Sequence, residues 1–270
     1  MEARIQNKVV FLTGASGGIG RACAEMFADE EVRLVLHGHD HFDEVEALAD
    51  ELPIETAAVQ GDISDEADVE RIFAEAVEAF SQIDVVVANA GIWPPDPTPL
   101  HAMSLEQWER TITTNLTGTF LCAREYFRHL EKTRPDSASL VLVGSTAALF
   151  GEADHADYAA SKAGLTYGLT RTLKNEIVAL VPTGRVNAVC PGWTLTRMTE
   201  EAMRDQDLVV PTLQTRPLKK IARARDVASA VVFLASDALA GHVTGEVLTV
   251  AGGMEGRLLH PAEDIDPSQA

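Results

Sequence analysis

The chain of 270 residues has 46% hydrophobic and 23% charged residues, which is typical of a globular protein with a substantial core. Its formal net charge is −19 and its lysines and arginines are not clustered, so the composition argues against nucleic acid or an anionic membrane as a partner. No apolar run approaches the ~20 residues of a membrane-spanning helix, and no long apolar stretch follows Met1, so we expect a cytoplasmic protein.

The three cysteines, Cys23, Cys122 and Cys190, lie far apart in apolar segments. None has Cys-x-x-Cys or Cys/His spacing, so we expect buried structural thiols and no metal site.

A glycine-rich turn follows the first apolar run, residues 9–12. Gly14, Gly18 and Gly20 lie between this predicted strand and an amphipathic helix, where they permit a tight turn and close approach to a pyrophosphate. A glycine turn without a ligand is the alternative, but the position near the N-terminus favours a dinucleotide site.

The second predicted strand, residues 33–36, ends at a tip where the adenosine ribose of a dinucleotide would lie. An acid there selects NAD, whereas arginine selects NADP. Gly38 is not acidic, His39 is a weak base and Asp40 comes one residue late, so these residues leave the choice open.

The next segments alternate between helix and strand. Residues 40–52 and 65–80 have apolar residues at helical spacing, and residues 55–59 and 84–88 are predicted strands. After the first of these strands, Asp62-Ile63 offers a carboxylate that either contacts adenine or starts the next helix, with Ser64 as its N-cap. After the second, Asn89-Ala90-Gly91 provides a small surface beside a cofactor.

A long helix is predicted from Ser104 to about Leu130 by a capping-box pattern. Asn115 lies within it, and this polar residue bends the helix, holds a water or makes a satisfied contact in a helix interface. A strand over residues 139–143 then ends at Ser145.

Tyr158 and Lys162 lie one turn apart on a predicted helix over residues 156–180. A free tyrosine titrates near pH ~10, and a cation beside it would stabilise the phenolate and lower its pKa. An isolated Tyr-x-x-x-Lys is more often simple packing, so its meaning depends on the residues around it.

A sixth strand, residues 185–190, ends at Pro191-Gly192. Residues 197–220 are predicted to form a mobile helical lid, residues 226–234 a helix, residues 245–250 a seventh strand, and residues from about 258 to 270 a flexible tail. Regular alternation without a linker predicts a single domain over residues 1–270. We expect a doubly wound, Rossmann-like, seven-stranded parallel sheet with helices on both faces and a site at the carboxyl ends of its strands.

Taken together, the glycine turn, Asn89-Ala90-Gly91, Asn115, Ser145, Tyr158-x-x-x-Lys162 and Pro191-Gly192-x-x-x-Thr196 resemble the short-chain dehydrogenase/reductase family. The resemblance covers roughly residues 5–254 and implies that Tyr158 is the general acid/base. It implies that Lys162 holds the nicotinamide ribose and lowers the pKa of Tyr158, that Ser145 orients the substrate oxygen and that Asn115 links Lys162 to solvent through a water. It also implies a set of NAD(P)(H)-binding residues: Gly14, Ser16, Gly18, Ile19, Gly20, Gly38, His39, Asp62, Ile63, Asn89, Ala90, Gly91, Tyr158, Lys162, Pro191, Gly192, Thr194 and Thr196.

The resemblance therefore predicts an oxidoreductase that interconverts a secondary alcohol and a ketone, with 3-oxoacyl, hydroxyacyl and sugar-alcohol substrates all open. NADP is slightly favoured over NAD, because His37-Gly38-His39 is similar to a Gly-Arg tip with a weaker base. A mostly apolar cleft is expected, with polarity at its mouth, from Trp93, Leu149, Phe150, Trp193, Met198, Glu152 and His155. A catalytically silent dinucleotide-binding sensor or scaffold is the alternative. Family members usually form tetramers through their two long helices, here about residues 104–131 and 156–180.

Overall fold

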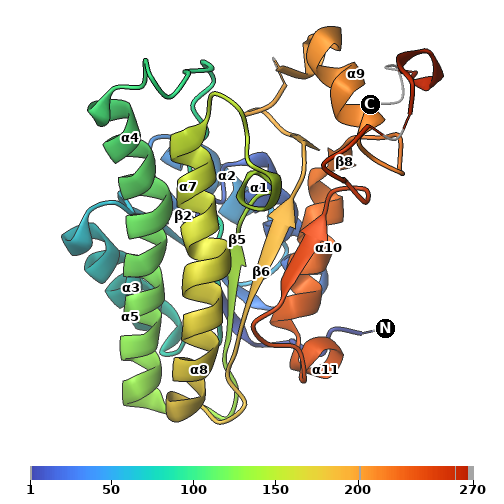
Figure 1. Cartoon of the computed structure of the whole chain (residues 1–270). Coiled ribbons are helices and arrows are strands. Elements are labelled where there is room, and N and C mark those ends of the chain that lie inside the picture. Colours follow the sequence, from blue (N-terminus) through green and yellow to red (C-terminus); the bar gives the residue numbers. More distant parts are fainter. Residues whose placement is uncertain (1, 201, 259, 267–270) are drawn as a thin grey trace.

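A computed structural model describes residues 2–200, 202–258 and 260–266. Within them, seven parallel strands form one sheet in the order β3-β2-β1-β4-β5-β6-β9 (Figure 1). The strands are β1 (Val9–Leu12), β2 (Arg33–Gly38), β3 (Thr56–Gln60), β4 (Val85–Ala88), β5 (Ser139–Val143), β6 (Arg185–Pro191) and β9 (Val247–Val250). The prediction of a doubly wound, seven-stranded parallel sheet is confirmed.

The central strands β1 and β4 are continuous apolar runs, as expected for strands whose two faces are both covered by helices. Every residue of β1, β4, β5 and β6 is buried, whereas β9 at the edge is only partly covered. In the parallel register, Val10 of β1 lies between Leu34 of β2 and Val85 of β4.

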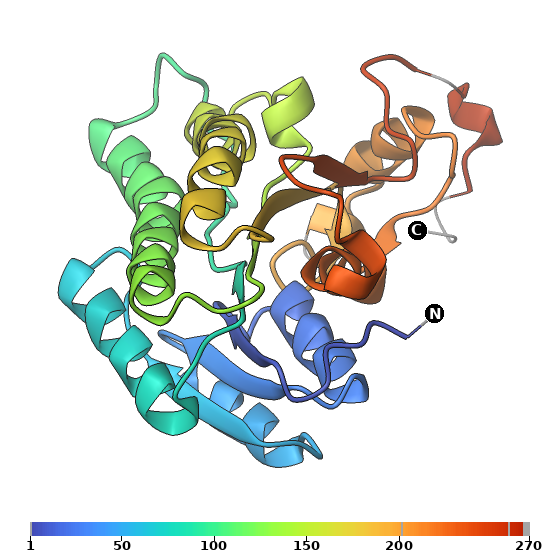
Figure 2. The same ribbon diagram turned by 90° about the horizontal axis from the view of Figure 1, so that it is seen from below.

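Helices cover both faces of the sheet, as Figure 2 shows from below, and an apolar core lies on each face. One core packs against α1 (Gly18–Asp29), α2 (Phe42–Glu51), α10 (Ala224–Ala235) and α11 (Asp237–Ala240). The other packs against α3 (Glu66–Phe80), α5 (Gly118–Thr133) and α8 (Thr170–Leu180).

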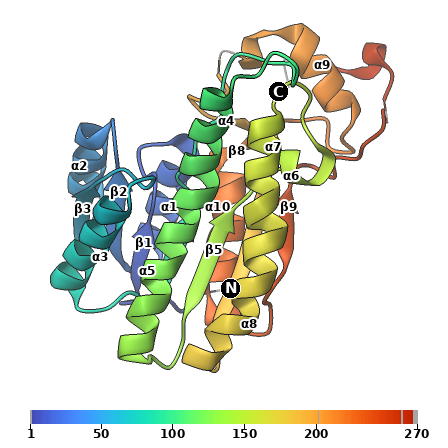
Figure 3. The same ribbon diagram turned by 60° about the vertical axis from the view of Figure 1, so that its left-hand side comes forward.

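The two long predicted helices both contain a π-helical segment (Figure 3). Residues Thr113–Thr117 separate α4 (Leu105–Ile112) from α5, and residues Gly164–Leu169 separate α7 (Ala156–Ala163) from α8. The first segment contains Asn115, for which a bend was one of three alternatives from the sequence, whereas the second was not predicted. Ser104 caps α4 as expected, since its Oγ accepts from the Gln107 amide at 3.1 Å.

The segment between β6 and α10 contains regular secondary structure. A two-stranded sheet of β7 (Thr194–Leu195) and β8 (Ala222–Arg223) frames a 3₁₀ turn, Ala202–Arg204, and helix α9 (Gln206–Gln214). The predicted lid is therefore helical, and Figure 1 shows α9 beyond the carboxyl ends of the strands.

Residues 260–266 of the predicted flexible tail pack against α9. Ile265 is 8% exposed and packs in a small cluster with Val209, Leu213 and Ile221. The Gln214 side chain donates to the His260 carbonyl at 2.9 Å, and the His260 amide donates to the Gln214 carbonyl. One apolar residue in a polar segment gave no periodic signal, so the sequence did not reveal this contact. Residues 259 and 267–270 of the predicted tail lie outside the described part of the chain.

Candidate active site

A cavity of about 580 Å³ opens where β1 and β4 end and the strand order reverses. It brings together every residue predicted for the cofactor, as well as Ser145, Tyr158 and Lys162. Asn115 alone among the predicted site residues does not line it. The cavity is large enough for an elongated ligand and lies where ligands bind in doubly wound sheets.

The glycine turn lies at one end of this cavity. Gly14 has a φ of +69°, which favours glycine, and a Cβ on Gly20 would approach the Gly14 carbonyl oxygen to 2.0 Å. Helix α1 begins directly after the turn without a side-chain cap, and the amides of Gly18 and Ile19 donate to no backbone carbonyl in the described segments. These free donors at a helix N-terminus fit an anionic phosphate group.

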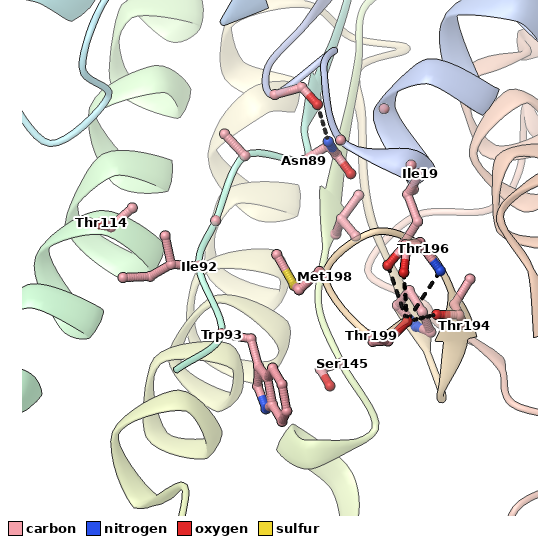
Figure 4. A pocket seen from close by; sticks show the side chains of 18 of the residues that line it. Ile19, Asn89, Ile92, Trp93, Thr114, Ser145, Thr194, Thr196, Met198 and Thr199 are labelled. Carbon is pink, nitrogen blue, oxygen red and sulfur yellow. Dashed lines mark hydrogen bonds between the residues drawn. The ribbon is translucent and has the colours of Figure 1, made fainter. Parts of the chain in front are cut away.

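Strand β4 is tied to the glycine turn by hydrogen bonds. The Thr13 hydroxyl accepts from the amides of Asn89 and Ala90, each at 3.0 Å. The Asn89 side chain donates to the carbonyls of Thr13 and Gly14, also at 3.0 Å. Asn89 therefore lines the cavity while its amide group holds the glycine turn in place (Figure 4).

The tip of β2 presents a buried histidine beside two exposed residues. His37 is 2% exposed, accepts from the Gly14 amide at 3.3 Å, and contacts the Gly61 carbonyl through Nε2 at 2.9 Å. Burial lowers the pKa of His37, and the two contacts match a neutral ring protonated on Nε2. His39 and Asp40 lie at the cavity, with their side chains 53% and 82% exposed and 3.4 Å apart.

Asp62 lines the cavity beyond β3 and also holds the following turn. Its Oδ1 accepts from the Ser64 amide at 2.8 Å and from the Ser64 hydroxyl at 2.7 Å. Ser64 was predicted to cap the next helix, but the N-cap of α3 is Asp65, whose side chain accepts from the Asp68 amide. Asp62 thus supports the turn, and its position leaves the second carboxylate oxygen for a ligand.

A cluster of threonines follows β6. The Thr199 hydroxyl donates to the Thr194 carbonyl at 2.6 Å and lies 3.2 Å from the Thr196 hydroxyl (Figure 4). Beside it, Arg197 lines the cavity and forms an ion pair with Glu44 of α2 at 2.8 Å. Thr196 also contacts the glycine turn, since a Cβ on Gly18 would lie 2.9 Å from its Cβ.

Tyr158 and Ser145 meet near the centre of the cavity. The Ser145 hydroxyl opposes a rise in the pKa of Tyr158, and its Oγ accepts from the Ala147 amide at 3.1 Å. Desolvation is the larger effect and raises the pKa of Tyr158 to about 12, with a further increase from the charge of Glu152. The phenol is therefore protonated at neutral pH.

Lys162 does not lower the pKa of Tyr158 in this structure, which corrects the expectation from sequence. Its ammonium lies 5.8 Å from the centre of the Tyr158 ring and donates to the Val143 carbonyl at 2.9 Å. The lysine is 5% exposed, and burial lowers its own pKa to about 8. The pKa of each group moves toward favouring its neutral form, because the loss of water around it outweighs the contacts that oppose this shift.

Asn115 lies behind the cavity wall and is fully buried. Its side chain accepts from the Ile92 amide at 2.7 Å and donates to the Ile92 carbonyl and the Ser161 hydroxyl. A Cβ on Gly91 would lie 2.9 Å from the Asn115 Oδ1 and 3.3 Å from the Lys162 ammonium, so these groups are neighbours. Asn115 joins the π-helical segment to the loop after β4 and to the helix that carries Lys162.

The far end of the cavity is largely aromatic. Trp93 and Trp193 pack edge to face with ring centres 5.9 Å apart, and Glu152 lines the cavity beside them. Figure 4 shows Trp93 and Met198 on this wall. Three residues predicted for the cleft do not line it. Leu149 lies at a separate groove and Phe150 is 45% exposed, because both belong to the short helix α6 (Ala147–Phe150), which the sequence did not predict. His155 is buried behind Trp93, with the two rings stacked 5.0 Å apart.

Sequence reasoning missed several cavity residues. Thr114, Arg197 and Thr199 line the cavity from segments with no motif around them, and only their proximity to Asn115 and Thr196 in the chain could have indicated them. The Thr13 hydroxyl also organises the loop after β4, a role that its place in the sequence did not indicate. All three cysteines are buried free thiols, as expected. The described residues contain no helix long and apolar enough to cross a membrane.

Comparison with known proteins gives one consistent result. A family model described as enoyl-(acyl carrier protein) reductase matches residues 14–255. A 3-oxoacyl-[acyl-carrier-protein] reductase from Synechocystis sp. is 35% identical over 92% of this chain and 96% of its own length. A cis-4-hydroxycyclohexanecarboxylate dehydrogenase from Sinomonas cyclohexanicum is 35% identical over 91% of this chain and 96% of its own length.

Solved structures show the same relationship. A glucose/ribitol-type short-chain dehydrogenase/reductase from Brucella melitensis superposes with a TM-score of 0.85 and 36% identity, covering 94% of this chain and 99% of that chain. Levodione reductase has the same TM-score with 29% identity, covering 93% and 98%. The protein therefore belongs to the short-chain dehydrogenase/reductase family and is an NAD(P)-dependent oxidoreductase of alcohol and carbonyl groups.

Proposed function

We propose that Tyr158 is the general acid/base of this oxidoreductase and that Ser145, Lys162 and Asn115 support it. The observation that carries this proposal is that Ser145, Tyr158 and Lys162 line one cavity, with the Lys162 ammonium 5.8 Å from the centre of the Tyr158 ring. A protonated phenol gives its proton to a carbonyl oxygen during reduction, and the phenolate takes the hydroxyl proton during oxidation. Ser145 donates to the same oxygen and orients it.

Lys162 and Asn115 have positioning roles in this proposal. The Lys162 ammonium faces the cavity from α7 and would hold ribose hydroxyls of the bound cofactor. Asn115 holds the Ile92 backbone and Ser161 beside it and thereby sets the position of Lys162. Solvent protons would reach the site through a water near Asn115.

The dinucleotide would lie along the carboxyl ends of the strands, and the nicotinamide supplies or accepts the hydride. The free amides at the start of α1 fit its pyrophosphate, and Asp62 and Ile63 fit its adenine. Gly91, Pro191, Gly192, Thr194 and Thr196 line the part of the cavity next to Lys162 and fit the nicotinamide half.

NADP is the preferred cofactor in this proposal. The β2 tip has no acid at Gly38 or His39, and the nearest carboxylate, Asp40, is 82% exposed and close to His39. Arg197 lines the same cavity and is available for a phosphate if it leaves Glu44. Direct titration with NADPH and NADH tests this, with tighter NADPH binding expected and tighter NADH binding contradicting it.

Neutral ketones and secondary alcohols with an apolar body are the proposed substrates, because the aromatic end of the cavity suits them. The relatives act on 3-oxoacyl, ring and sugar-type compounds according to their names, so a screen should include all three types with both cofactors. Oxidation of NAD(P)H that depends on a ketone supports the proposal. Binding of NAD(P)H without turnover of any ketone would instead favour a silent sensor or scaffold, which the enzymatic relatives do not favour.

We also propose a homotetramer in the cytoplasm. Exposed apolar side chains lie on both long helical segments, Leu105 and Phe120 on one and Tyr167 and Val178 on the other, with exposures of 37–68%. Three buried free thiols agree with a reducing compartment. Light scattering that gives the mass of a monomer would contradict the tetramer, and cell fractionation tests the location.

A further inference from the structure

Glu152 is an acidic residue at the aromatic end of the cavity, on the loop between α6 and α7. Its side chain is 24% exposed, and every other wall residue named at this end is aromatic or aliphatic. A carboxylate in such surroundings loses much of its hydration, so it needs partners.

One carboxylate oxygen has such a partner and the other does not. The Trp93 indole donates to Glu152 Oε1 at 3.2 Å. Glu152 Oε2 takes part in no hydrogen bond within residues 2–200, 202–258 and 260–266, although the side chain lines the cavity. The carboxylate is therefore held by one oxygen and offers the second as an acceptor.

The groups around Glu152 hold it in place. His155 stacks on Trp93 with an interplanar angle of 11°, and its ring nitrogens lie 3.0 Å from the Pro94 carbonyl and 3.1 Å from the Ala153 carbonyl. His155 Nδ1 lies 3.9 Å from Glu152 Oε1. His155 therefore contacts both Trp93 and Glu152 and helps to fix their side-chain conformations.

Glu152 lines the same cavity as Tyr158 and Ser145. Its charge raises the pKa of Tyr158. Burial raises the pKa of Glu152 itself, while His155 and the Trp93 indole act in the opposite direction. A substrate that reaches from Tyr158 to Trp93 lies beside this carboxylate, because Glu152 is hydrogen-bonded to the Trp93 indole.

We propose that Glu152 selects substrates that carry a second hydrogen-bond donor, a hydroxyl or an ammonium, a few bonds from the reacting carbon, and that it rejects carboxylate-bearing ketones. This rests on the proposed function of the same site. The free oxygen of Glu152 accepts from the donor, and Trp93 and Trp193 pack on the apolar body between the donor and the carbonyl. A carboxylate at the same place would face like charge in a partly desolvated site.

The test uses cyclohexanones that carry hydroxyl, ammonium, hydrogen or carboxylate at the ring position opposite the carbonyl, and straight-chain methyl ketones with the same four end groups. The full chain is assayed with NADPH as wild type, Glu152→Gln and Asp154→Asn. Glutamine keeps the acceptor for Trp93 and removes the charge. Asp154 lies on the same loop with an exposed side chain and a φ of 63°, which asparagine tolerates, so Asp154→Asn is the matched control.

For wild type and Asp154→Asn we expect kcat/KM to be about tenfold higher for donor-bearing ketones than for the unsubstituted ones, and lowest for carboxylates. In Glu152→Gln, the ratio of kcat/KM for the hydroxyl substrate to kcat/KM for the carboxylate substrate should fall by about tenfold or more. If Glu152→Gln lowers kcat/KM only for the ammonium substrates, the preferred donor is a cation, because glutamine can still accept a hydrogen bond from a hydroxyl.

The inference is contradicted if wild type has a higher kcat/KM for carboxylate-bearing ketones than for the others. It is also contradicted if Glu152→Gln leaves the ratio of kcat/KM for hydroxyl and carboxylate substrates unchanged. In both cases turnover of a ketone still supports the proposed function. Absence of turnover with every ketone, in a protein that still binds NADPH, contradicts the proposed function and this inference together.

Discussion

Lys162 shows most clearly how the site differs from what its sequence spacing suggests. The Tyr-x-x-x-Lys pattern predicted a cation that lowers the pKa of its tyrosine. In the structure, burial dominates both groups, raising the pKa of Tyr158 to about 12 and lowering that of Lys162 to about 8. Lys162 nevertheless carries its charge at pH 7, because a pKa of about 8 leaves its ammonium mostly protonated there.

The buried ammonium should reduce the stability of the cofactor-free protein. An unfolded lysine titrates near pH ~10.4, so the folded state binds fewer protons between that value and pH 8, and stability rises with pH through this window. Below pH 8 the penalty is fully present. Lys162→Met should therefore raise the free energy of unfolding at pH 7 by about 1–3 kcal/mol, and the difference should vanish near pH 10.

Urea unfolding at pH 7 and pH 10 measures this effect. Lys220→Met removes an exposed lysine and should change the free energy of unfolding by less than about 0.5 kcal/mol at either pH. A Lys162→Met variant that is less stable than wild type at pH 7 would show that the hydrogen bond to Val143 outweighs the cost of burial.

At the scale of elements, the docked segment 260–266 connects the C-terminal part of the described chain to the substrate end of the cavity. Ile265 packs with Val209 and Leu213 of α9, and Trp193 of the cavity wall packs against the same cluster. Hydrogen bonds between Gln214 and His260 hold the two segments together. The lid and the wall therefore share one small core.

Ile265→Ala should loosen this core and raise KM for a ketone about three- to tenfold, because a truncated isoleucine removes packing of about 2 kcal/mol from the lid. Cofactor affinity should stay within about twofold, since the glycine turn does not contact the cluster. Steady-state kinetics and cofactor titration give both values. Leu258→Ala truncates a residue that is 67% exposed and is the control, and equal effects of the two variants would contradict the role of the cluster.

Elements with strong local signals were predictable from the sequence. The apolar strands, the amphipathic helices and Gly14, Gly18 and Gly20 lie where periodicity and turn chemistry placed them. The second π-helical segment, β7 with β8, and the docking of Ile265 depend on contacts between distant segments, which no local pattern records. For the same reason, spacing showed that Tyr158 and Lys162 share a helix face but not the effect of burial on either pKa.

For the whole molecule, the net charge of −19 is a distributed property that no single contact represents. Like charges repel across the surface and favour expansion, and salt screens this repulsion, since the Debye length falls from ~10 Å at 0.1 M to ~3 Å at 1 M. Exposed ion pairs such as Arg128–Glu70 lose some strength in salt, but each contributes little.

Unfolding free energy should therefore increase between 0.05 M and 1 M NaCl, by about 1–3 kcal/mol. Thermal and urea unfolding across this range measure it, with a neutral osmolyte of equal osmolarity as the control. A protein that loses stability as salt rises would indicate that surface ion pairs outweigh the net repulsion.

The measurement that tests the central claim most directly compares wild type with Tyr158→Phe in cofactor binding and in ketone turnover. Removing the phenol hydroxyl leaves the ring in place, so NADPH affinity should stay within about threefold, while kcat/KM for any ketone that wild type reduces should fall by about 10²–10⁴-fold. A Tyr158→Phe variant that reduces ketones at a rate near that of wild type would show that another group supplies the proton.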